Sequence, residues 1–207
     1  MKKRILSLAI SAALVLTMLP AGALAAGDKG TPPVYNKATG CYEISTPDQL
    51  LYLSGSWKDG APRDGHYVLT ADIDMSGVKG FKPIASKKDK GFIGTFDGQF
   101  HAIKGLRVEY EKKYAGLFGY VGNQDDQAYI KDVALLDCYV TGQQNVGALA
   151  GVNYGTITGC VVTGEVKCLD LSNSHTAGGI CGKLKEGEGP IVGHVEDCYI
   201  NADVSAP

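Results

Sequence analysis

The sequence Gly116-Leu117-Phe118-Gly119 has two related copies further along the chain, Gly147-Ala148-Leu149-Ala150-Gly151 and Gly178-Gly179-Ile180-Cys181-Gly182. One large apolar residue holds the same place in each copy, and these residues are 32 and then 31 positions apart. Repeats of roughly 20–50 residues are typical of solenoids, because such a unit buries its apolar face only by stacking on a neighbour. The spacing therefore predicts an inward-facing column of Leu117, Leu149 and Ile180.

A second pattern, apolar-x-x-apolar-x-apolar, lies between the glycine motifs. Its copies are Ile103/Leu106/Val108, Ile130/Val133/Leu135, Ile157/Cys160/Val162 and Val195/Cys198/Ile200. The last two residues of each copy alternate at the strand period, so they face the same side. Stacked in sequence order, the middle residues predict a second column of Leu106, Val133, Cys160 and Cys198. The set Leu135/Cys138/Val140 fits the same pattern, and this alternative register would stack Cys138 over Cys160.

The N-terminal residues have the features of a secretory signal peptide. A basic start precedes an apolar run over residues 5–19, and Ala23-Leu24-Ala25 fits the small-x-small cleavage pattern. The apolar run is shorter than the roughly 20 residues that cross a membrane. We therefore expect export to the extracellular space or cell surface. The predicted parts are a signal peptide (1–25), a flexible lead (26–40) and one β domain without a membrane span (41–207).

The composition agrees with a small exported β protein. Glycine makes up 28 of the 207 residues, about twice the usual share, and occurs beside Val, Ile, Leu and Tyr, as in short strands joined by tight turns. Without the signal peptide the chain has 17 basic and 22 acidic residues, a net charge of −5. This balance argues against nucleic acid and anionic membranes as partners. The six cysteines are expected either as small buried side chains or as a disulfide framework, with Cys160 and Cys198 close enough to bond.

One short helix is predicted to begin at Thr46. Thr46 suits the N-cap, Pro47 the first helical position, and Gln49 the reciprocal position of a capping box. Leu50 and Leu53 form an apolar stripe on one side. Because so short a helix is unstable alone, the stripe is expected to cover the N-terminal end of the core.

Four segments resemble the GLUG-motif repeats of bacterial surface proteins. They are GFIGTFDGQFHAIKGL (91–106), YAGLFGYVG (114–122), NVGALAGVNYGTITGCVVTGEV (145–166) and TAGGICG (176–182), and the resemblance extends over residues 41–204. It implies a mostly β protein with the pectin lyase-like fold, a right-handed parallel β-helix, of the kind found in adhesin-like proteins and in the N-terminal regions of IgA-specific metallopeptidases. The last copy of the triplet lacks a following glycine motif, so the chain is expected to be the N-terminal piece of a longer protein or a truncated gene product.

Catalytic chemistry has weak support in the sequence. A polysaccharide lyase needs clustered carboxylates, often around calcium, and a base; Asp72, Asp74, Asp97 and His101 are the residues available for it. All four are more simply turn, cap or strand residues, and two carboxylates at Asp72 and Asp74 fall short of the six to eight oxygen ligands of calcium. The histidines never take the spacing of a zinc peptidase helix.

Tyrosines provide the remaining functional signal. Tyr139 and Tyr199 each follow a cysteine that is predicted to face inward, so both rings are expected to face outward, either as ordinary surface or as a site that stacks on sugars or contacts a protein. The sequence thus favours a non-catalytic surface module for adhesion, glycan binding or use as a stalk, with no cofactor. The alternatives are a lyase-like enzyme and the accessory region of a larger secreted peptidase.

Overall fold

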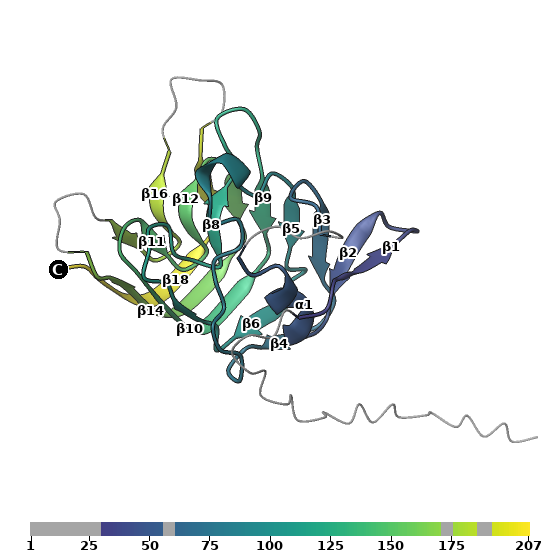
Figure 1. The fold of residues 1–207 in the computed structure, drawn as a ribbon, viewed down its shortest axis with the longest axis horizontal. Coiled ribbons are helices and arrows are strands. Elements are labelled where there is room, and N and C mark those ends of the chain that lie inside the picture. Colours follow the sequence, from purple (N-terminus) through teal and green to yellow (C-terminus); the bar gives the residue numbers. More distant parts are fainter. Residues whose placement is uncertain (1–29, 56–60, 171–175, 186–191) are drawn as a thin grey trace, which may run out of the picture.

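The computed structural model describes residues 30–55, 61–170, 176–185 and 192–207 (Figure 1). The predicted signal peptide, residues 1–25, lies outside the described residues. Within them the protein is mostly β, and its strands form four sheets. The strand pairs are parallel except for β1 and β2, which pair antiparallel at the N-terminal edge.

The largest sheet has the spatial order β1 (Val34–Asn36), β2 (Cys41–Ile44), β3 (His66–Leu69), β5 (Thr95–Asp97), β9 (Tyr129–Lys131), β13 (Thr156–Thr158) and β17 (His194–Glu196). The second has the order β18 (Tyr199–Ser205), β14 (Val161–Cys168), β10 (Ala134–Gly142), β6 (Ala102–Lys104) and β4 (Ile73–Asp74), with β7 (Arg107–Glu109) also on β10. The third has the order β16 (Cys181–Leu184), β12 (Ala150–Asn153) and β8 (Phe118–Val121), and β11 (Val146–Gly147) pairs with β15 (Ala177–Gly178).

The chain passes through the three larger sheets in a fixed order. It runs from β5 through β6 and β7 to β8, from β9 through β10 to β12, from β13 through β14 to β16, and then through β17 to β18. Each circuit lays its strands beside those of the circuit before it, which explains why the pairs are parallel.

Apolar side chains at matched register fill the space between the sheets. On the largest sheet, Tyr67, Phe96, Ile130 and Ile157 pair in succession, and all four are fully buried. On the second sheet the corresponding fully buried set is Ile73, Ile103, Leu135 and Val162. At about 0.8 kcal/mol per buried methylene, these columns are the main favourable contribution to folding.

The glycine motifs lie at the third sheet. Leu117 and Leu149 are fully buried and Ile180 is nearly so. The N–H of Leu117 donates to the carbonyl of Ala148, and the N–H of Leu149 donates to that of Ile180. A Cβ on Gly147 would lie 2.5 Å from the Cα of Cys181, so the motif needs glycine where two circuits approach each other.

The predicted second column is wrong at Leu106. Val133, Cys160 and Cys198 do follow one another, because the N–H of Val161 donates to Val133 and that of Tyr199 donates to Cys160. Leu106, however, lies opposite Cys138, whose neighbour Tyr139 pairs with Arg107.

The reason for this shift is that Ile103 is not equivalent to Ile130. Ile103 pairs with Leu135 on the second sheet, whereas Ile130 pairs with Phe96 on the first. The alternative register fails as well, since a register irregularity between Leu135 and Cys138 sets Cys138 opposite Gly164 instead of Cys160.

The predicted helix is present as α1 (Pro47–Tyr52). Thr46 accepts a hydrogen bond from the N–H of Gln49 at 3.3 Å, and the Gln49 side chain accepts from the N–H of Ser45 at 2.7 Å. Leu50 and Leu53 are buried in the main core, at the end of the molecule that also holds β1 and β2 (Figure 1). No helix among the described residues is long and apolar enough to cross a membrane.

The predicted flexible lead is partly ordered. Residues 34–36 form β1 and pair with β2, and Tyr35 packs against Tyr42 with ring centroids 4.9 Å apart. The order comes from the antiparallel pairing with β2, since the side chains of Val34 and Tyr35 themselves remain exposed.

Candidate binding groove beside the third sheet

The third sheet carries a small second cluster of side chains, separate from the main core. Phe118 and Val121 both pack into the main core, whereas Tyr120, between them in β8, packs with Val152 and Tyr154. The Gly119-Tyr120 step therefore interrupts the alternation of the strand. Tyr120 pairs with Val152 and Val152 with Lys183, which forms one row across β8, β12 and β16.

The tyrosines of this cluster are in mutual contact. The rings of Tyr114 and Tyr120 are 4.7 Å apart, and Tyr120 and Tyr154 are 3% and 6% exposed. Burial raises the pKa of Tyr120, and hydrogen bonding to Tyr114 raises it further. The phenol therefore stays protonated at neutral pH and keeps its ability to donate a hydrogen bond.

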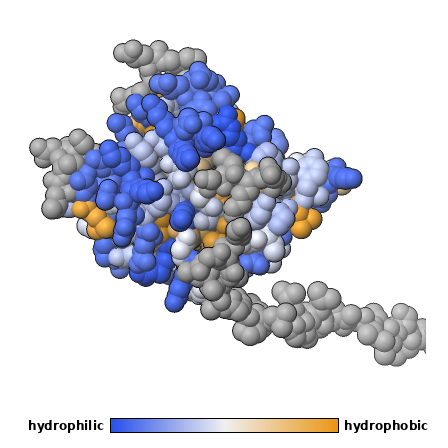
Figure 2. All heavy atoms as spheres, viewed as in Figure 1, coloured by the Kyte–Doolittle hydropathy of each residue, from blue (hydrophilic) through white to orange (hydrophobic). Residues whose placement is uncertain are grey.

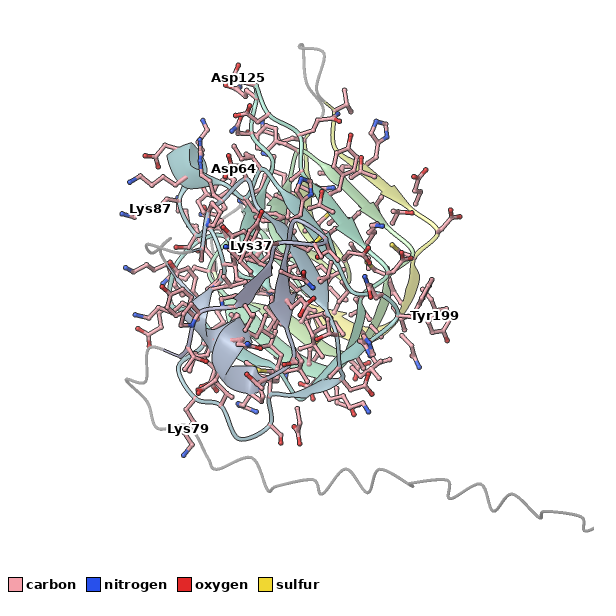
Figure 3. The ribbon with its side chains drawn as sticks, turned by 90° about the vertical axis from the view of Figure 1, so that its right-hand side faces the viewer. Lys37, Asp64, Lys79, Lys87, Asp125 and Tyr199 are labelled. Carbon is pink, nitrogen blue, oxygen red and sulfur yellow. The ribbon has the colours of Figure 1, made fainter. Side chains whose placement is uncertain are left out.

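Residues 84–92 run beside β8 and form one wall. Ile84 forms an isolated bridge with Phe118, and Phe92 forms one with Val121. Between these two anchors the chain bulges outward and makes the short 3₁₀ helix η1 (Lys88–Lys90), whose residues are exposed. Figure 3 shows Lys87, which precedes η1, projecting from this edge of the molecule.

Residues 123–126 form the opposite wall. The side-chain oxygen of Asn123 accepts hydrogen bonds from the N–H groups of Asp125 and Asp126, at 2.7 and 2.8 Å, and its amide nitrogen donates to the Asp126 carboxylate at 3.0 Å. These bonds fix the loop in a tight turn, and Asp125 lies at its tip (Figure 3).

The two walls enclose a groove of about 430 Å³. It is lined by Arg63, Lys88, Asp89, Asn123, Gln124, Asp125, Asp126 and Tyr154. A smaller hollow of about 130 Å³ adjoins it, and Lys88 and Tyr154 border both. Figure 2 shows hydrophilic side chains gathered over this upper part of the molecule. The larger volume is within the range of small-molecule sites, roughly 300–1,000 Å³.

The chemistry of the groove suits recognition of a hydroxyl-rich ligand. Amide, carboxylate and guanidinium groups offer paired donors and acceptors, and Tyr154 adds the edge of an aromatic ring. The described lining holds no histidine, cysteine or serine, so a hydroxyl or thiol nucleophile paired with histidine is absent from it, and its acidic groups are the carboxylates of Asp89, Asp125 and Asp126.

The predicted calcium residues have other partners. Asp72 accepts hydrogen bonds from the N–H of Ala102 at 3.0 Å, from His101 at 3.3 Å and from Lys104 at 3.4 Å. Asp74 accepts from the N–H of Ser76 at 2.9 Å. These donors lower the pKa of both carboxylates, mainly through the Ala102 N–H at Asp72 and through Ser76 at Asp74.

No metal-binding constellation is visible in the described parts of the chain. They contain no group of three or more His, Cys, Asp or Glu side chains that could hold a metal ion. Asp97, which the sequence placed near this set, accepts from the N–H of Gln99 and pairs with Lys131 at 2.8 Å. These residues act as turn and cross-strand residues.

The predicted tyrosine pair does not form one surface. Tyr139 lies between two cations, with the Arg107 guanidinium 4.3 Å and the Lys167 ammonium 5.2 Å from its ring centroid. Tyr199 is 62% exposed on β18, and β14 separates β18 from β10. The two rings therefore belong to different parts of the second sheet.

The cysteines are all unpaired in the described residues. Cys160 is buried and burial raises the pKa of its thiol to about 12, whereas Cys198 beside it is partly exposed. Of the two expectations for the cysteines, the structure has the set of small unpaired thiols, of which three are buried and three are partly exposed.

Sequence reasoning missed the groove because its lining comes from four separate segments.

A fully buried asparagine was also missed. Asn153 donates to the carbonyl of His194 at 2.9 Å and accepts from the N–H of Gly155 at 2.9 Å, so it joins two circuits at a turn. An asparagine two residues before a glycine, the spacing of an Asx turn, was the available signal.

The fold and the groove define a class: a mostly β protein of stacked parallel strands with a polar groove on its outside.

No protein-family model matches the chain. Halomucin of Haloquadratum walsbyi is 34% identical over 143 residues, which is 62% of this chain and 2% of halomucin. A candidate Gly-rich membrane protein of Evansella cellulosilytica is 32% identical over 101 residues, 44% of this chain and 11% of that protein.

One solved structure shares the fold. It is a candidate immunoglobulin A1 protease from Bacteroides ovatus, with a TM-score of 0.59 and 22% identity, and the match covers 84% of this chain and 49% of that one. The chain therefore corresponds to a small part of the two relatives and to about half of the structural neighbour.

Proposed function

We propose that this chain is a non-catalytic, extracellular module of a bacterial surface protein and that it binds glycans in the groove beside the third sheet. The observation that carries the proposal is the groove itself, about 430 Å³ in volume and lined by Arg63, Asn123, Gln124, Asp125 and other planar polar groups next to Tyr154. Sugars are bound by such paired donors and acceptors beside an aromatic ring.

The scaffold we propose is a right-handed parallel β-helix built from GLUG-type repeats. Three observations support it: the fixed order in which the chain passes through the sheets, the parallel pairing of successive circuits, and the buried columns at matched register. The likeness to the Bacteroides ovatus chain is compatible with this scaffold. In this scaffold, α1 would cover the N-terminal end of the β-helix.

The location we propose is outside the cell. The signal-peptide pattern of residues 1–25 supports export, and one of the two relatives is named as a membrane protein. Since the chain spans 2% and 11% of those relatives, we propose that it works as one module of a longer chain.

The structural neighbour favours a second candidate function. A match to 49% of a candidate immunoglobulin A1 protease is compatible with the accessory region of a larger secreted peptidase. In that case the module would recognise a glycoprotein for a catalytic region elsewhere in the protein.

Affinity electrophoresis against a panel of soluble polysaccharides tests the glycan proposal. Arg63→Ala and Gln124→Ala should each weaken retardation about fivefold, since one hydrogen bond contributes about 1 kcal/mol. Lys79→Ala is the control, because Lys79 is exposed at the end of the molecule opposite Asp125 (Figure 3). If no polysaccharide in the panel is retarded, the proposal fails, and release of unsaturated sugars would indicate a lyase instead.

A further inference from the structure

We propose that the groove selects anionic glycans, and that a carboxylate or sulfate group of the ligand sits in the smaller hollow among Lys88, Lys183 and Lys185. This inference rests on the proposed glycan binding and adds the chemical class of the ligand. It starts from the lining of the hollow, which comprises these three lysines together with Tyr114, Tyr120, Asn145, Val152 and Tyr154.

The strand geometry explains why two of the lysines meet there. Lys183 lies in β16 in register with Val152 of β12, and the N–H of Lys185 donates to the carbonyl of Asn153 at 3.0 Å. Lys185 follows directly after the end of β16, and the side chains of Lys183 and Lys185 both line the hollow. The Lys185 ammonium is 5.9 Å from the ring centroid of Tyr154, which holds this charge near the floor of the hollow.

The third lysine arrives from a distant part of the sequence. Lys88 is the first residue of η1, on the segment that runs beside β8, and it borders both the groove and the hollow. Three positive charges thus surround a space of about 130 Å³. Mutual repulsion among them is relieved when an anion binds.

These lysines differ from the other lysines on the strands. Elsewhere, Lys131 pairs with a carboxylate on the neighbouring strand, Lys167 with one on its own strand, and Lys104 with Asp72 just before β4. Within the described residues, no carboxylate lines the hollow, and none of its three lysines forms an ion pair. In a chain with a net negative charge, such a local excess of positive charge points to an anionic ligand.

Neutral donors complete the hollow. The Tyr120 hydroxyl is hydrogen-bonded to Tyr114, which leaves the Tyr114 hydroxyl to donate to a ligand. The Asn145 side-chain oxygen is already occupied by the Thr176 hydroxyl at 2.7 Å, so its amide nitrogen is the group that can donate. Charge-assisted hydrogen bonds from lysine are roughly twice as strong as neutral ones, and several together select an anion over a hydroxyl group.

The groove itself, unlike the hollow, contains carboxylates. Asp89, Asp125 and Asp126 line it together with Arg63, and the three carboxylates are exposed. They would repel a second acidic group but accept hydrogen bonds from sugar hydroxyls. A glycan would therefore lie with its acidic group in the hollow and its neutral hydroxyls toward residues 123–126.

Matched polymers test the inference. Polygalacturonate is compared with its methyl ester, and dextran sulfate with dextran, by titration calorimetry on the full chain. We expect each charged polymer to bind at least about tenfold more tightly than its neutral partner, with an advantage that shrinks between about 50 and 300 mM NaCl as the charges are screened. Tight binding of one charged polymer alone would support the inference and identify the acidic group as sulfate or carboxylate.

Substitutions localise the effect. The double variant Lys183→Gln/Lys185→Gln should lose about tenfold in affinity for the charged polymers and keep its affinity for the neutral ones, whereas Lys79→Gln should change neither. Equal binding of charged and neutral polymers would overturn this inference and leave the proposed function standing. Tight charged-polymer binding that the double variant retains would also overturn it, because the acidic group would then bind elsewhere. Binding of no polymer at all would refute the proposed function.

Discussion

Replacement of Leu149 by alanine tests the stacked core directly. Leu149 is fully buried and lies between the equivalent residues of two neighbouring circuits, Leu117 and Ile180. The substitution removes three carbon atoms from the middle of this column. Because circuits pack against Leu149 from both sides, the backbone has little room to close the space that is left.

The magnitude follows from that environment. Leu→Ala changes in protein cores cost about 2–5 kcal/mol, and the cost is highest where the surroundings cannot collapse. We therefore expect Leu149→Ala to lower the free energy of unfolding by about 3–4 kcal/mol. With a urea m-value of about 2 kcal/mol/M, this lowers the midpoint of unfolding by about 1.5–2 M.

Urea unfolding followed by tyrosine fluorescence and circular dichroism measures the difference. The control is Leu169→Ala, since the Leu169 side chain is 57% exposed and should change stability by no more than about 0.5 kcal/mol. If the two variants unfold at the same urea concentration, Leu149 does not sit inside a column and the reasoning from stacked repeats is refuted.

Three further predictions concern a backbone contact, a carboxylate and a thiol. Gly147→Ala should destabilise by about 1–3 kcal/mol in the same urea assay, because its methyl group would overlap the backbone at Cys181. Asp72→Asn should cost no more than about 0.5 kcal/mol at pH 7, as its carboxylate is exposed. Since the folded pKa of Asp72 is lowered, the difference should shrink as acid protonates the carboxylate, and a difference that grows in acid would contradict this. Iodoacetamide at pH 8 should alkylate Cys41 but spare Cys160 until denaturant is added, as read by peptide mass spectrometry, because Cys160 is buried and its pKa is raised to about 12.

Much of the local structure could be predicted from short-range patterns. The cap of α1 formed at Thr46 because a threonine, a proline and a glutamine at fixed offsets satisfy the free N–H groups of the first turn. The burial of Leu117 and Leu149 followed from their repeat, since equivalent residues of stacked units meet equivalent surroundings.

The register of the first full circuit could not be predicted in this way. The triplets Ile103/Leu106/Val108 and Ile130/Val133/Leu135 have the same spacing of apolar residues. Ile103 nevertheless pairs with Leu135, the last residue of the second triplet. The apolar pattern predicts which residues are buried, but it does not specify to which of the sheets each buried residue belongs. Phe96 is the residue that pairs with Ile130, and it packs edge-on against Phe118 inside the core, with ring centroids 5.5 Å apart.

By itself, then, the sequence determined a β protein of stacked repeats, a capped helix near its start and buried leucines in the glycine motifs, because these depend on spacing along the chain and on side-chain polarity. Only the tertiary structure decided where surface residues meet. Arg63, Lys88, residues 123–126, Tyr154 and Lys183 lie as much as 120 positions apart in the sequence. They converge because successive circuits return to the same sheet a few ångströms apart, and the length of each outward loop, which no periodicity encodes, sets the walls of the groove.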